Sequence, residues 1–420
     1  MGSQLRPRRA SSPALPGRVA APLAVGGRVA RGLAQRLARR MSSWSPRTPD
    51  RWVFAGRADA YVDNPRYLFE HVADHHRAIE ATWISGDPAV VQRVRAHGRR
   101  AERRWSARGI RATLRAGVAV YSFDPGDVNV ALTGGAVGVN LYHGVPLKQI
   151  EGDIRVGSAA RVYHPSTPID RLRAATVYYP RTLANDLVLA TSPDVAAEMQ
   201  RAFGRRARRM LIGRPPRLAG ALHTSAATER PDDAEATSVL LYAPTWRVPP
   251  GFDLAEALGD LGALEEALRR DGSRLLVKAH LYDRVTLPRS ARRIELLDSE
   301  SDINEVLGTV DGLITDYSSV MFDAALLGLP IVFYPFDLDE YRRHSSESFS
   351  FDYDQLVEGR AARRSEELID MIGSGAWRSA GFPGSVRDRV WGPGDQPSVP
   401  ESNRRLVAEI AAVADERFGS

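Results

Sequence analysis

The chain has 420 residues, an apolar fraction of 43% and a formal net charge of +6. That length allows two domains with full cores, and the absence of cysteine excludes disulfides, thiolate metal ligands and a thiol nucleophile. No apolar run approaches the ~18 residues of a membrane-spanning helix and no secretory signal is apparent, so we expect the protein to stay in the cytoplasm.

The positive charge is concentrated in residues 1–49. Ten arginines and no acidic residue precede Asp50, so the rest of the chain carries a negative balance. Apolar residues recur at helical spacing between these arginines, at Val25, Val29, Leu33 and Leu37. This pattern predicts a basic amphipathic arm able to lie on an anionic membrane surface, with a disordered extension as the alternative. No nucleic-acid partner is expected, because no aromatic residue interrupts the arginines before Trp44.

Residues 50–223 alternate between strand-like and helix-like segments, which predicts a Rossmann-like parallel sheet covered on both faces. The expected strands are 51–56, 81–85, 118–122, 137–142, 187–192 and 211–213. Helices are expected after Pro65, at 88–97, over 99–115 as one helix, and at 193–203. Asp63 and Asn64 are interpreted as the cap of the first helix, with Pro65 at its first helical position.

A polar stretch at 224–237 is the expected linker to a second alternating series at 238–395, and a C-terminal helix is expected at 396–420. The second series predicts strands near 239–243, 275–280, 294–297, 311–315 and 331–334, with helices at 254–269, 303–310 and 320–328. We therefore predict an α/β protein with two doubly wound domains that face a cleft.

In the second series, an apolar strand joins a helix directly, with Asp316, Ser318 and Ser319 at the turn. Backbone N–H groups and the positive end of the helix dipole favour a phosphate at such a turn. An ordinary helix cap by Ser318 is the alternative interpretation. Asp323 lies four residues after Ser319, on the same helix face, where its carboxylate can accept hydrogen bonds from ligand hydroxyls.

A second polar strand end contains His143, Gly144, Pro146 and Lys148. Imidazole titrates near neutral pH, so His143 is a candidate general base, and Lys148 is placed to hold an anion. A lone histidine is more often structural, but glycine and proline at the end of a buried strand favour a site.

Basic residues in other strand-end segments are candidates for phosphate contacts. Lys278 and His280 are two residues apart and face the same side of a strand, although an edge strand with polar ends explains them too. Arg247, after Thr245, and Arg217 have the forked geometry that suits phosphate oxygens. No Walker loop or dinucleotide fingerprint is present, so ATP and NAD are not expected, and we do not interpret Asp337 and Asp339 as metal ligands.

Several blocks in this order resemble the CDP-glycerol glycerophosphotransferases, which build or prime teichoic-acid-like poly(glycerol phosphate) chains. The blocks are 63–65, 143–148, 241–247, 278–280, 302–307, 315–319 with Asp323, and 334–341. The resemblance covers roughly residues 50–375. The chain departs from the usual pattern at Tyr142, where the family has tryptophan, at 214–218 and at 357–359, which leaves the polyol and acceptor undetermined.

The resemblance implies a glycosyltransferase-B-like fold, with a CDP-polyol donor held mainly by the C-terminal domain and a lipid-linked or glycan acceptor. It makes His143 the catalytic histidine and His280 a second essential one. It implies donor contacts from Pro244, Thr245, Lys278, Ser318, Ser319 and Asp323. Together with the polar strand ends, the expected substrate-binding set is Tyr142, Gly144, Pro146, Lys148, Arg217, Pro244, Thr245, Arg247, Lys278, Asp316, Ser318, Ser319 and Asp323.

The resulting hypothesis is a transferase that moves glycerol phosphate, or a related polyol phosphate, from CDP-glycerol to an acceptor hydroxyl with release of CMP. It would serve teichoic-acid-like or capsular polymer synthesis, as a peripheral protein on the cytoplasmic face of the membrane. No metal site is predicted, and the use of a divalent cation is left open. The alternatives are a nucleotide-sugar glycosyltransferase of the same fold and a catalytically silent, nucleotide-binding membrane scaffold.

Overall fold

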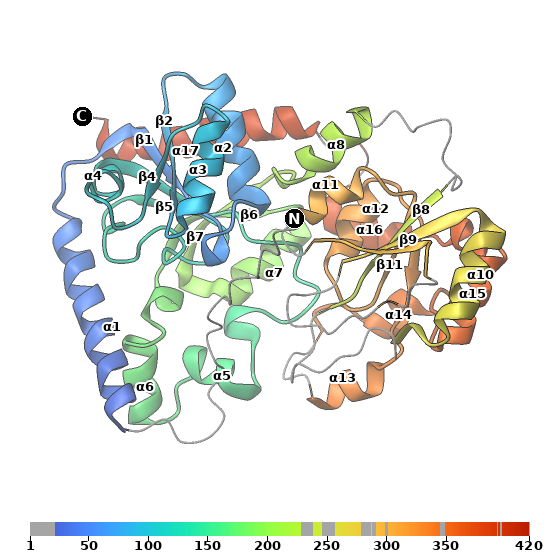
Figure 1. Ribbon diagram of the computed structural model, residues 1–420. Helices are drawn as coiled ribbons and strands as arrows, with labels where there is room; N and C mark the ends of the chain where they lie inside the picture. The colour runs from blue at the N-terminus through green and yellow to red at the C-terminus, as the bar shows by residue number, and fades with distance from the viewer. Residues whose placement is uncertain are drawn as a thin grey trace, which may run out of the picture.

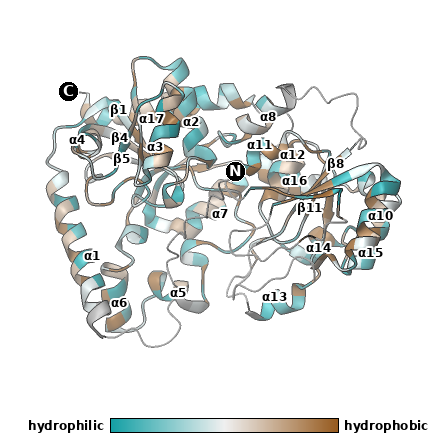
Figure 2. Ribbon diagram, in the orientation of Figure 1, coloured by the Kyte–Doolittle hydropathy of each residue, from teal (hydrophilic) through white to brown (hydrophobic). Residues whose placement is uncertain are grey.

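The computed structural model describes residues 22–227, 238–245, 257–278, 287, 291–298, 301–344, 349–392, 394 and 397–419. Two lobes lie side by side, each built around one parallel sheet (Figure 1). The predicted α/β class with two doubly wound sheets is therefore confirmed. Apolar residues gather on the strands and on the helix faces that cover them (Figure 2), as expected for sheets buried on both faces.

The first sheet has the strand order β3-β2-β1-β4-β5-β6-β7, and all its pairs are parallel. Its strands are β1 (Thr48–Phe54), β2 (Glu80–Ser85), β3 (Ala101–Arg103), β4 (Ala116–Tyr121), β5 (Val137–Asn140), β6 (Asn185–Ala190) and β7 (Ala207–Ile212). The order reverses between β1 and β4, and ligands of doubly wound sheets bind at the carboxyl ends of strands beside such a reversal.

The second sheet has the order β10-β9-β8-β11-β12, again all parallel. Its strands are β8 (Ser238–Ala243), β9 (Ser273–Val277), β10 (Ile294–Leu296), β11 (Gly312–Thr315) and β12 (Ile331–Phe333). Here the order reverses between β8 and β11. Thr245 and Asp316 follow these two strands, so the fold brings them to the same edge of the sheet.

Helices cover both faces of each sheet (Figure 1). With the first sheet are α2 (Asp63–His75), α3 (Pro88–Ala96), α4 (Ala107–Arg115), α5 (Gly157–Tyr163), α6 (Pro168–Ala175), α7 (Pro193–Phe203) and α17 (Val399–Phe418). With the second are α10 (Leu261–Asp271), α11 (Ile303–Leu307), α12 (Val320–Leu326), α13 (Leu338–His344), α14 (Tyr353–Val357), α15 (Ser365–Gly373) and α16 (Gly384–Trp391), and α8 (Leu218–Ala227) connects the lobes. Single 3-10 turns are η1 (Arg57–Asp59), η2 (Glu151–Asp153), η3 (Tyr179–Thr182), η4 (Gly204–Arg206) and η5 (Ala376–Ser379).

Three local predictions are wrong. The helix expected over 99–115 is the short strand β3 followed by α4, whose cap is Ser106; its hydroxyl accepts from the Gly109 N–H. The helix expected over 254–269 is not continuous: its first residues lie outside the described part of the chain, residues 257–258 are helical, and after a break at 259–260 the helix α10 begins at Leu261, where the Asp260 carboxylate caps it. Helix α2 begins at Asp63 with Val62 at the cap position, so Pro65 is not its first helical residue.

The C-terminal helix returns to the first lobe. Helix α17 contacts β1 and β4, and Leu406, Val407 and Ile410 are buried with that lobe's core. Further links join the lobes near α16: the Thr191 hydroxyl donates to the Val390 carbonyl (2.6 Å). The lobes are therefore packed against each other through α7 and α16 as well as connected by the chain.

The basic arm is anchored over part of its length. Helix α1 (Pro22–Ser42) packs on α6, where Gly32 lies so close to Thr176 that no side chain would fit at position 32. Arg47, one of the ten arginines counted in the basic arm, is buried and donates to the carbonyls of Thr113, Ala116 and Leu132, among others. Residues 22–47 are thus part of the fold rather than a disordered extension. Among the described residues, no helix has both the length and the apolar character to cross a bilayer.

Candidate active site

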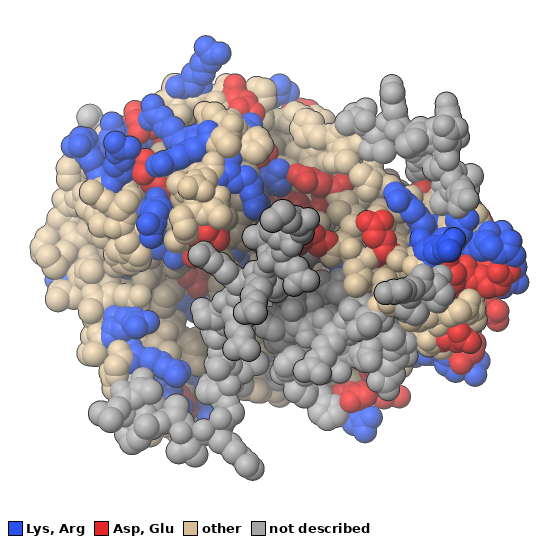
Figure 3. Space-filling view, viewed as in Figure 1, with Lys and Arg blue, Asp and Glu red and all other residues tan. Residues whose placement is uncertain are grey.

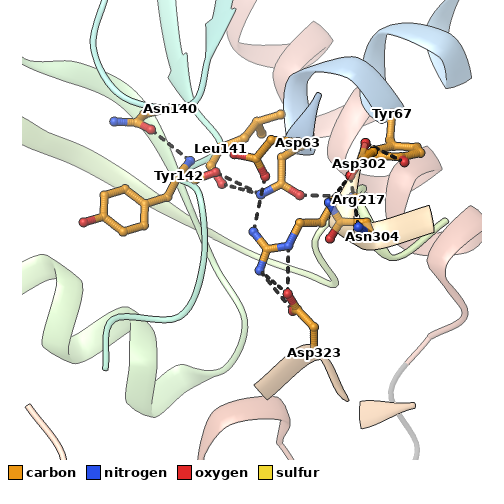
Figure 4. Close-up of polar contacts among 10 residues, drawn as sticks. Asp63, Tyr67, Asn140, Leu141, Tyr142, Arg217, Asp302, Asn304 and Asp323 are labelled. Carbon is orange, nitrogen blue, oxygen red and sulfur yellow. Dashed lines mark hydrogen bonds and ion pairs between the residues drawn. The ribbon is translucent and has the colours of Figure 1, made fainter. Parts of the chain in front are cut away.

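A buried ion-pair network joins the two lobes at the centre of the site (Figure 4). Arg217 donates from Nε and Nη2 to the two carboxylate oxygens of Asp323 (3.1 and 3.0 Å), and its Nη1 lies 3.4 Å from Asp63. Burial opposes the charge of Arg217, but Asp323 and Asp63 outweigh it and raise the pKa of the guanidinium. We had expected Arg217 to bind a phosphate and Asp323 to bind ligand hydroxyls. The structure pairs the two side chains with each other, and their contacts with a ligand stay predictions.

Asn64 fixes the strand end that carries the candidate base. Its amide nitrogen donates to the carbonyls of Leu141 (3.2 Å) and Tyr142 (2.9 Å), and its side-chain oxygen accepts from the Arg217 N–H (3.1 Å). Tyr142 has a positive φ of 53°, a conformation that a non-glycine residue adopts only when its surroundings impose it. Sequence reasoning treated Asn64 as a helix cap and missed this role. Asn64 lies in the block 63–65 that resembles the family, and this was the feature of the sequence that could have indicated its role.

The turn after β5 reaches the second lobe. A Cβ on Gly144, whose φ is +152°, would lie 2.8 Å from the Ser319 hydroxyl oxygen, so only glycine fits there. Farther along, the Ser350 N–H donates to the Leu147 carbonyl (2.9 Å), and the Lys148 ammonium lies 5.1 Å from the centre of the Tyr341 ring. The structure therefore brings the segment with His143 and Lys148 and the distant Ser319 to one interface between the lobes.

His143 is open to solvent, although protein surrounds it closely. Its ring lies 4.4 Å from that of Tyr142 and 6.0 Å from that of Phe123, centre to centre. The protein atoms packed around the ring desolvate it and lower the pKa of His143 to about 4, helped by the positive charges of Arg57 and Arg217 and opposed by a hydrogen bond with the Ser122 backbone. The imidazole is consequently neutral at pH 7 and able to accept a proton.

Two arginines that sequence reasoning missed lie beside this histidine. Arg57 follows β1 and stacks on Phe123 at 4.8 Å, and Arg181 stacks on the same ring at 5.0 Å. Because β1 and β4 flank the reversal of strand order, the segments that follow them meet at one sheet edge. Gly56, which ends the predicted strand just before Arg57, was the feature of the sequence that could have pointed to Arg57.

Asp316 organises the corresponding edge of the second sheet. It is fully buried, and one of its oxygens accepts from the Thr245 N–H (2.8 Å) and from the Thr245 hydroxyl (2.6 Å). Tyr353 donates to the Asp316 carbonyl (2.9 Å). Asp316 was expected to touch substrate, but in the structure its contacts shape the turn before Ser318, so it is a positioning residue.

The two serines of this turn present their hydroxyls to the site. Ser318 and Ser319 are partly exposed, and within the described part of the chain neither hydroxyl has a hydrogen-bond partner. The alternative interpretation, a helix cap by Ser318, is wrong, because Ser319 occupies the cap position of α12 and makes no side-chain cap bond. Both hydroxyls are therefore available to a ligand.

Lys278 lies at the end of β9 beside Asp298, to whose carbonyl its ammonium donates (2.8 Å). Burial lowers its pKa. Pro244 and Thr245 are partly exposed at the end of β8. His280 and Arg247 lie outside the described residues, so their expected roles stay predictions.

A second interlobe contact lies next to the network of Arg217 (Figure 4). Asp302, the cap of α11, accepts from the Tyr67 hydroxyl (2.9 Å) and from Arg66 Nη1 (3.1 Å), both on α2. Helix α2 thus bonds directly to α11 of the other lobe, and Arg217 links its residue Asp63 to Asp323 on α12. Within the described ranges, no group of three or more histidine, aspartate or glutamate side chains is arranged to hold a metal ion.

Two doubly wound lobes, with polar strand ends meeting between them, define a two-domain protein of the glycosyltransferase-B-like class. Residues 37–388 match the family described as CDP-Glycerol:Poly(glycerophosphate) glycerophosphotransferase. The match covers most of the chain, and the chain belongs to this family.

Named relatives are similar over shorter segments. A teichoic acid glycerol-phosphate transferase of Staphylococcus aureus is 32% identical over 138 residues, which is 32% of this chain and 35% of that protein. A teichoic acid poly(ribitol-phosphate) polymerase of Bacillus spizizenii is 44% identical over 71 residues, 17% of this chain and 11% of that protein. The matched segments therefore span about a third of the first relative and less of the second.

Solved structures share the fold over nearly the whole chain. A structure of the wall teichoic acid polymerase TagF covers 96% of this chain and 100% of its own, with a TM-score of 0.67 and 20% identity. A TagF variant soaked with CDPG aligns with a TM-score of 0.64 and 20% identity, over 95% of this chain and 100% of its own. At this identity the likeness establishes the fold.

Proposed function

We propose that the protein transfers glycerol phosphate, or a related polyol phosphate, from a CDP-polyol to a hydroxyl of a membrane-linked or glycan acceptor and releases CMP. The observation that carries this proposal is the contact between Gly144 and Ser319. Because Gly144 follows His143, the neutral histidine of one lobe lies near the turn of the other lobe that carries the hydroxyls of Ser318 and Ser319. Membership of the glycerophosphotransferase family supports the same chemistry.

In this mechanism His143 acts as the general base. The acceptor oxygen attacks the β-phosphorus, the bond from that phosphorus to the oxygen shared with the α-phosphate breaks, and CMP leaves with that oxygen. The imidazole takes the proton of the attacking hydroxyl. An anionic donor bound beside His143 favours the charged imidazolium, so donor binding raises the pKa from about 4 toward the range of a working base.

The surrounding groups stabilise the charge that develops on phosphate. The hydroxyls of Ser318 and Ser319 donate to phosphate oxygens, and Lys148, Lys278 and Arg57 supply positive charge. Arg217 holds the lobes in register through Asp323 rather than touching phosphate. Most of the rate acceleration thus comes from positioning and electrostatics, as in phosphoryl transfer generally.

The deciding experiment measures which nucleotide is released. The full chain is incubated with CDP-glycerol, CDP-ribitol, UDP-sugars or GDP-sugars, with a bacterial membrane extract as acceptor. We expect CMP from a CDP-polyol. Release of UDP or GDP would replace this function by nucleotide-sugar glycosyl transfer, and release of no nucleotide would favour the scaffold alternative. Parallel reactions with EDTA and with added Mg²⁺ determine whether turnover needs a divalent cation.

We further propose that α1 binds the anionic cytoplasmic surface of the membrane. Leu33, Leu37 and Met41 are 53%, 62% and 57% exposed at a spacing of four residues, and Trp44 is 76% exposed. Arginines flank them, among them the exposed Arg28. Apolar side chains beside arginines match the composition of helices that lie in a lipid headgroup layer.

The membrane proposal predicts that the double substitution Leu33→Ser and Leu37→Ser weakens binding to vesicles of phosphatidylglycerol and phosphatidylcholine about tenfold. Co-sedimentation of the full chain with vesicles measures this. The matched control is Ile212→Ser with Leu222→Ser, which removes two similarly exposed apolar side chains elsewhere. Equal binding by the α1 variant and the unaltered chain would contradict a membrane role for α1. Deleting residues 1–47 is a poorer test, because it removes the buried Arg47.

A further inference from the structure

A basic hollow lies on the first lobe, between β1, β2, the turn before β3, and α4. Its volume is about 590 Å³, within the range of ligand sites. Six arginines and two glutamates line it, and the arginines are Arg51, Arg95, Arg99, Arg100, Arg108 and Arg111. Blue side chains gather over this part of the molecule, where α3 and α4 lie (Figure 3).

The carboxylates balance only part of this charge. Arg95 pairs with Glu102 (2.9 Å) and Arg100 with Glu80 (2.9 Å). Arg108 and Arg111 are exposed on α4, one turn apart, and make no ion pair with any described residue. Arg108 and Arg111 therefore face solvent next to arginines whose charge is already paired. Their unpaired charge gives the hollow a net positive charge.

A second observation comes from Arg99 inside the lining. Its Nη2 donates to Asp74 (2.8 Å), but its Nε is buried with no hydrogen-bond partner among the described residues. A buried donor without an acceptor carries a free-energy cost, which an anionic ligand beside it would relieve.

The hollow is separate from the candidate active site. Glu80 is the first residue of β2, and Arg99 and Arg100 precede β3, so the hollow lies toward the amino ends of these strands. Arg57 follows the carboxyl end of β1, at the opposite edge of the same sheet. A ligand in the hollow therefore does not compete with the donor for space.

The lining selects among polyanions. Its one aromatic residue, Trp52, is 1% exposed, so it offers no free ring on which a nucleic-acid base could stack. Its apolar members Val53 and Ala101 are buried and Ala112 is half-buried with a single methyl group, so no large apolar side chain is presented for insertion among lipid tails. Arginines from a strand, a turn and a helix surround the space, which suits several phosphates on a flexible aliphatic chain.

We propose that this hollow binds the anionic poly(polyol phosphate) chain of the acceptor, away from the end that is extended. The proposal rests on the proposed function for the identity of the polymer. Holding the chain at a second point raises the effective concentration of its growing end at His143. The site thereby favours long acceptors over single units.

The test measures binding of a fluorescent oligo(glycerol phosphate) to the full chain by anisotropy. The double variant Arg108→Gln with Arg111→Gln, called the α4 variant, should bind at least about tenfold more weakly. The slope of log affinity against log salt concentration should also become shallower, by the amount that about two phosphate contacts contribute. The control, Arg292→Gln with Arg360→Gln, removes the same charge from exposed positions elsewhere and should leave the affinity unchanged. Equal weakening by both double variants would refute a specific site.

Two competitors identify the ligand class. Inorganic phosphate at the same phosphate concentration should displace the oligomer poorly, and efficient displacement would overturn the polymer assignment in favour of a single-anion site. The second competitor is a vesicle of phosphatidylglycerol. If the α4 variant binds these vesicles more weakly but binds the oligomer normally, the hollow would be assigned to lipid headgroups instead.

A turnover assay separates this proposal from the proposed function. With a one-unit soluble acceptor, the α4 variant should release CMP as fast as the unaltered chain, whereas with a long acceptor its KM should rise about tenfold. No CMP from the unaltered chain would refute the proposed function alone, because the anisotropy measurement needs no turnover. An unchanged KM for the long acceptor would refute the role of the hollow alone.

Discussion

Replacing His143 with glutamine should lower kcat by about 10²–10⁴-fold and leave CDP-glycerol binding measurable, because glutamine keeps a polar side chain but cannot take a proton. Initial rates of CMP release give kcat, and isothermal titration gives donor affinity. His97→Gln is the matched control, because His97 is exposed at the end of α3. Near-normal turnover by the His143 variant would show that another group is the base.

The pH dependence gives an independent check on the same residue. Burial and the neighbouring arginines lower the pKa of His143 to about 4, so the neutral base persists in the free protein well below pH 6.5. The acidic limb of kcat/KM, which reports the free protein, should therefore fall near pH 4, and that of kcat should lie higher once an anionic donor is bound. An acidic limb of kcat/KM near pH 6.5 would indicate that a group other than His143, with the ordinary pKa of a histidine, controls the reaction.

Replacing Arg217 with methionine should lower the free energy of unfolding by about 3–5 kcal/mol, because it leaves the carboxylate of Asp323 buried without its partner. Urea denaturation measures the loss. We also expect separate transitions for the two lobes, because Arg217 bonds to Asp323 on α12 and to Asp63 on α2.

Two further variants distinguish a lost ion pair from a general packing defect. Arg214→Met is the control, since Arg214 lies three residues away and its side chain donates to the Pro397 carbonyl (2.7 Å). Adding Asp323→Leu to the Arg217 variant should recover part of the stability, because no unpaired charge is then left on α12. A single transition and unchanged stability in the Arg217 variant would contradict the interlobe role.

The sequence was sufficient for the features that depend on local pattern. Alternating apolar segments predicted two parallel sheets, which the structure contains, and the polar residues at strand ends predicted a ligand site, which stays a prediction. Parallel sheets are buried on both faces, so their strands are readable as apolar runs and any polar residue at a strand end stands out. His143, Thr245 and Ser319 were found in this way.

Contacts between residues far apart in sequence were not predictable. Nothing in the neighbourhood of Arg217 or Asp323 indicates that they bond to each other across 106 positions. For the same reason Asn64 was interpreted as a local cap, and the buried hydrogen bonds of Arg47 were not foreseen. A guanidinium group or a side-chain amide can form hydrogen bonds with many kinds of partner. Only the packing of the two lobes decides which partner is within reach.

The sequence by itself determined the fold class, the family and the strand ends that are candidates for the chemistry, because these follow from periodicity and from short blocks of local order. The tertiary structure alone decided which of these polar residues are exposed between the lobes and which are buried in pairs that hold the lobes together. The physical reason is that burial and pairing depend on distances across the interface. Arg217 and Arg108 have the same side chain, but Arg217 is buried in an ion pair between the lobes, whereas Arg108 is exposed to solvent.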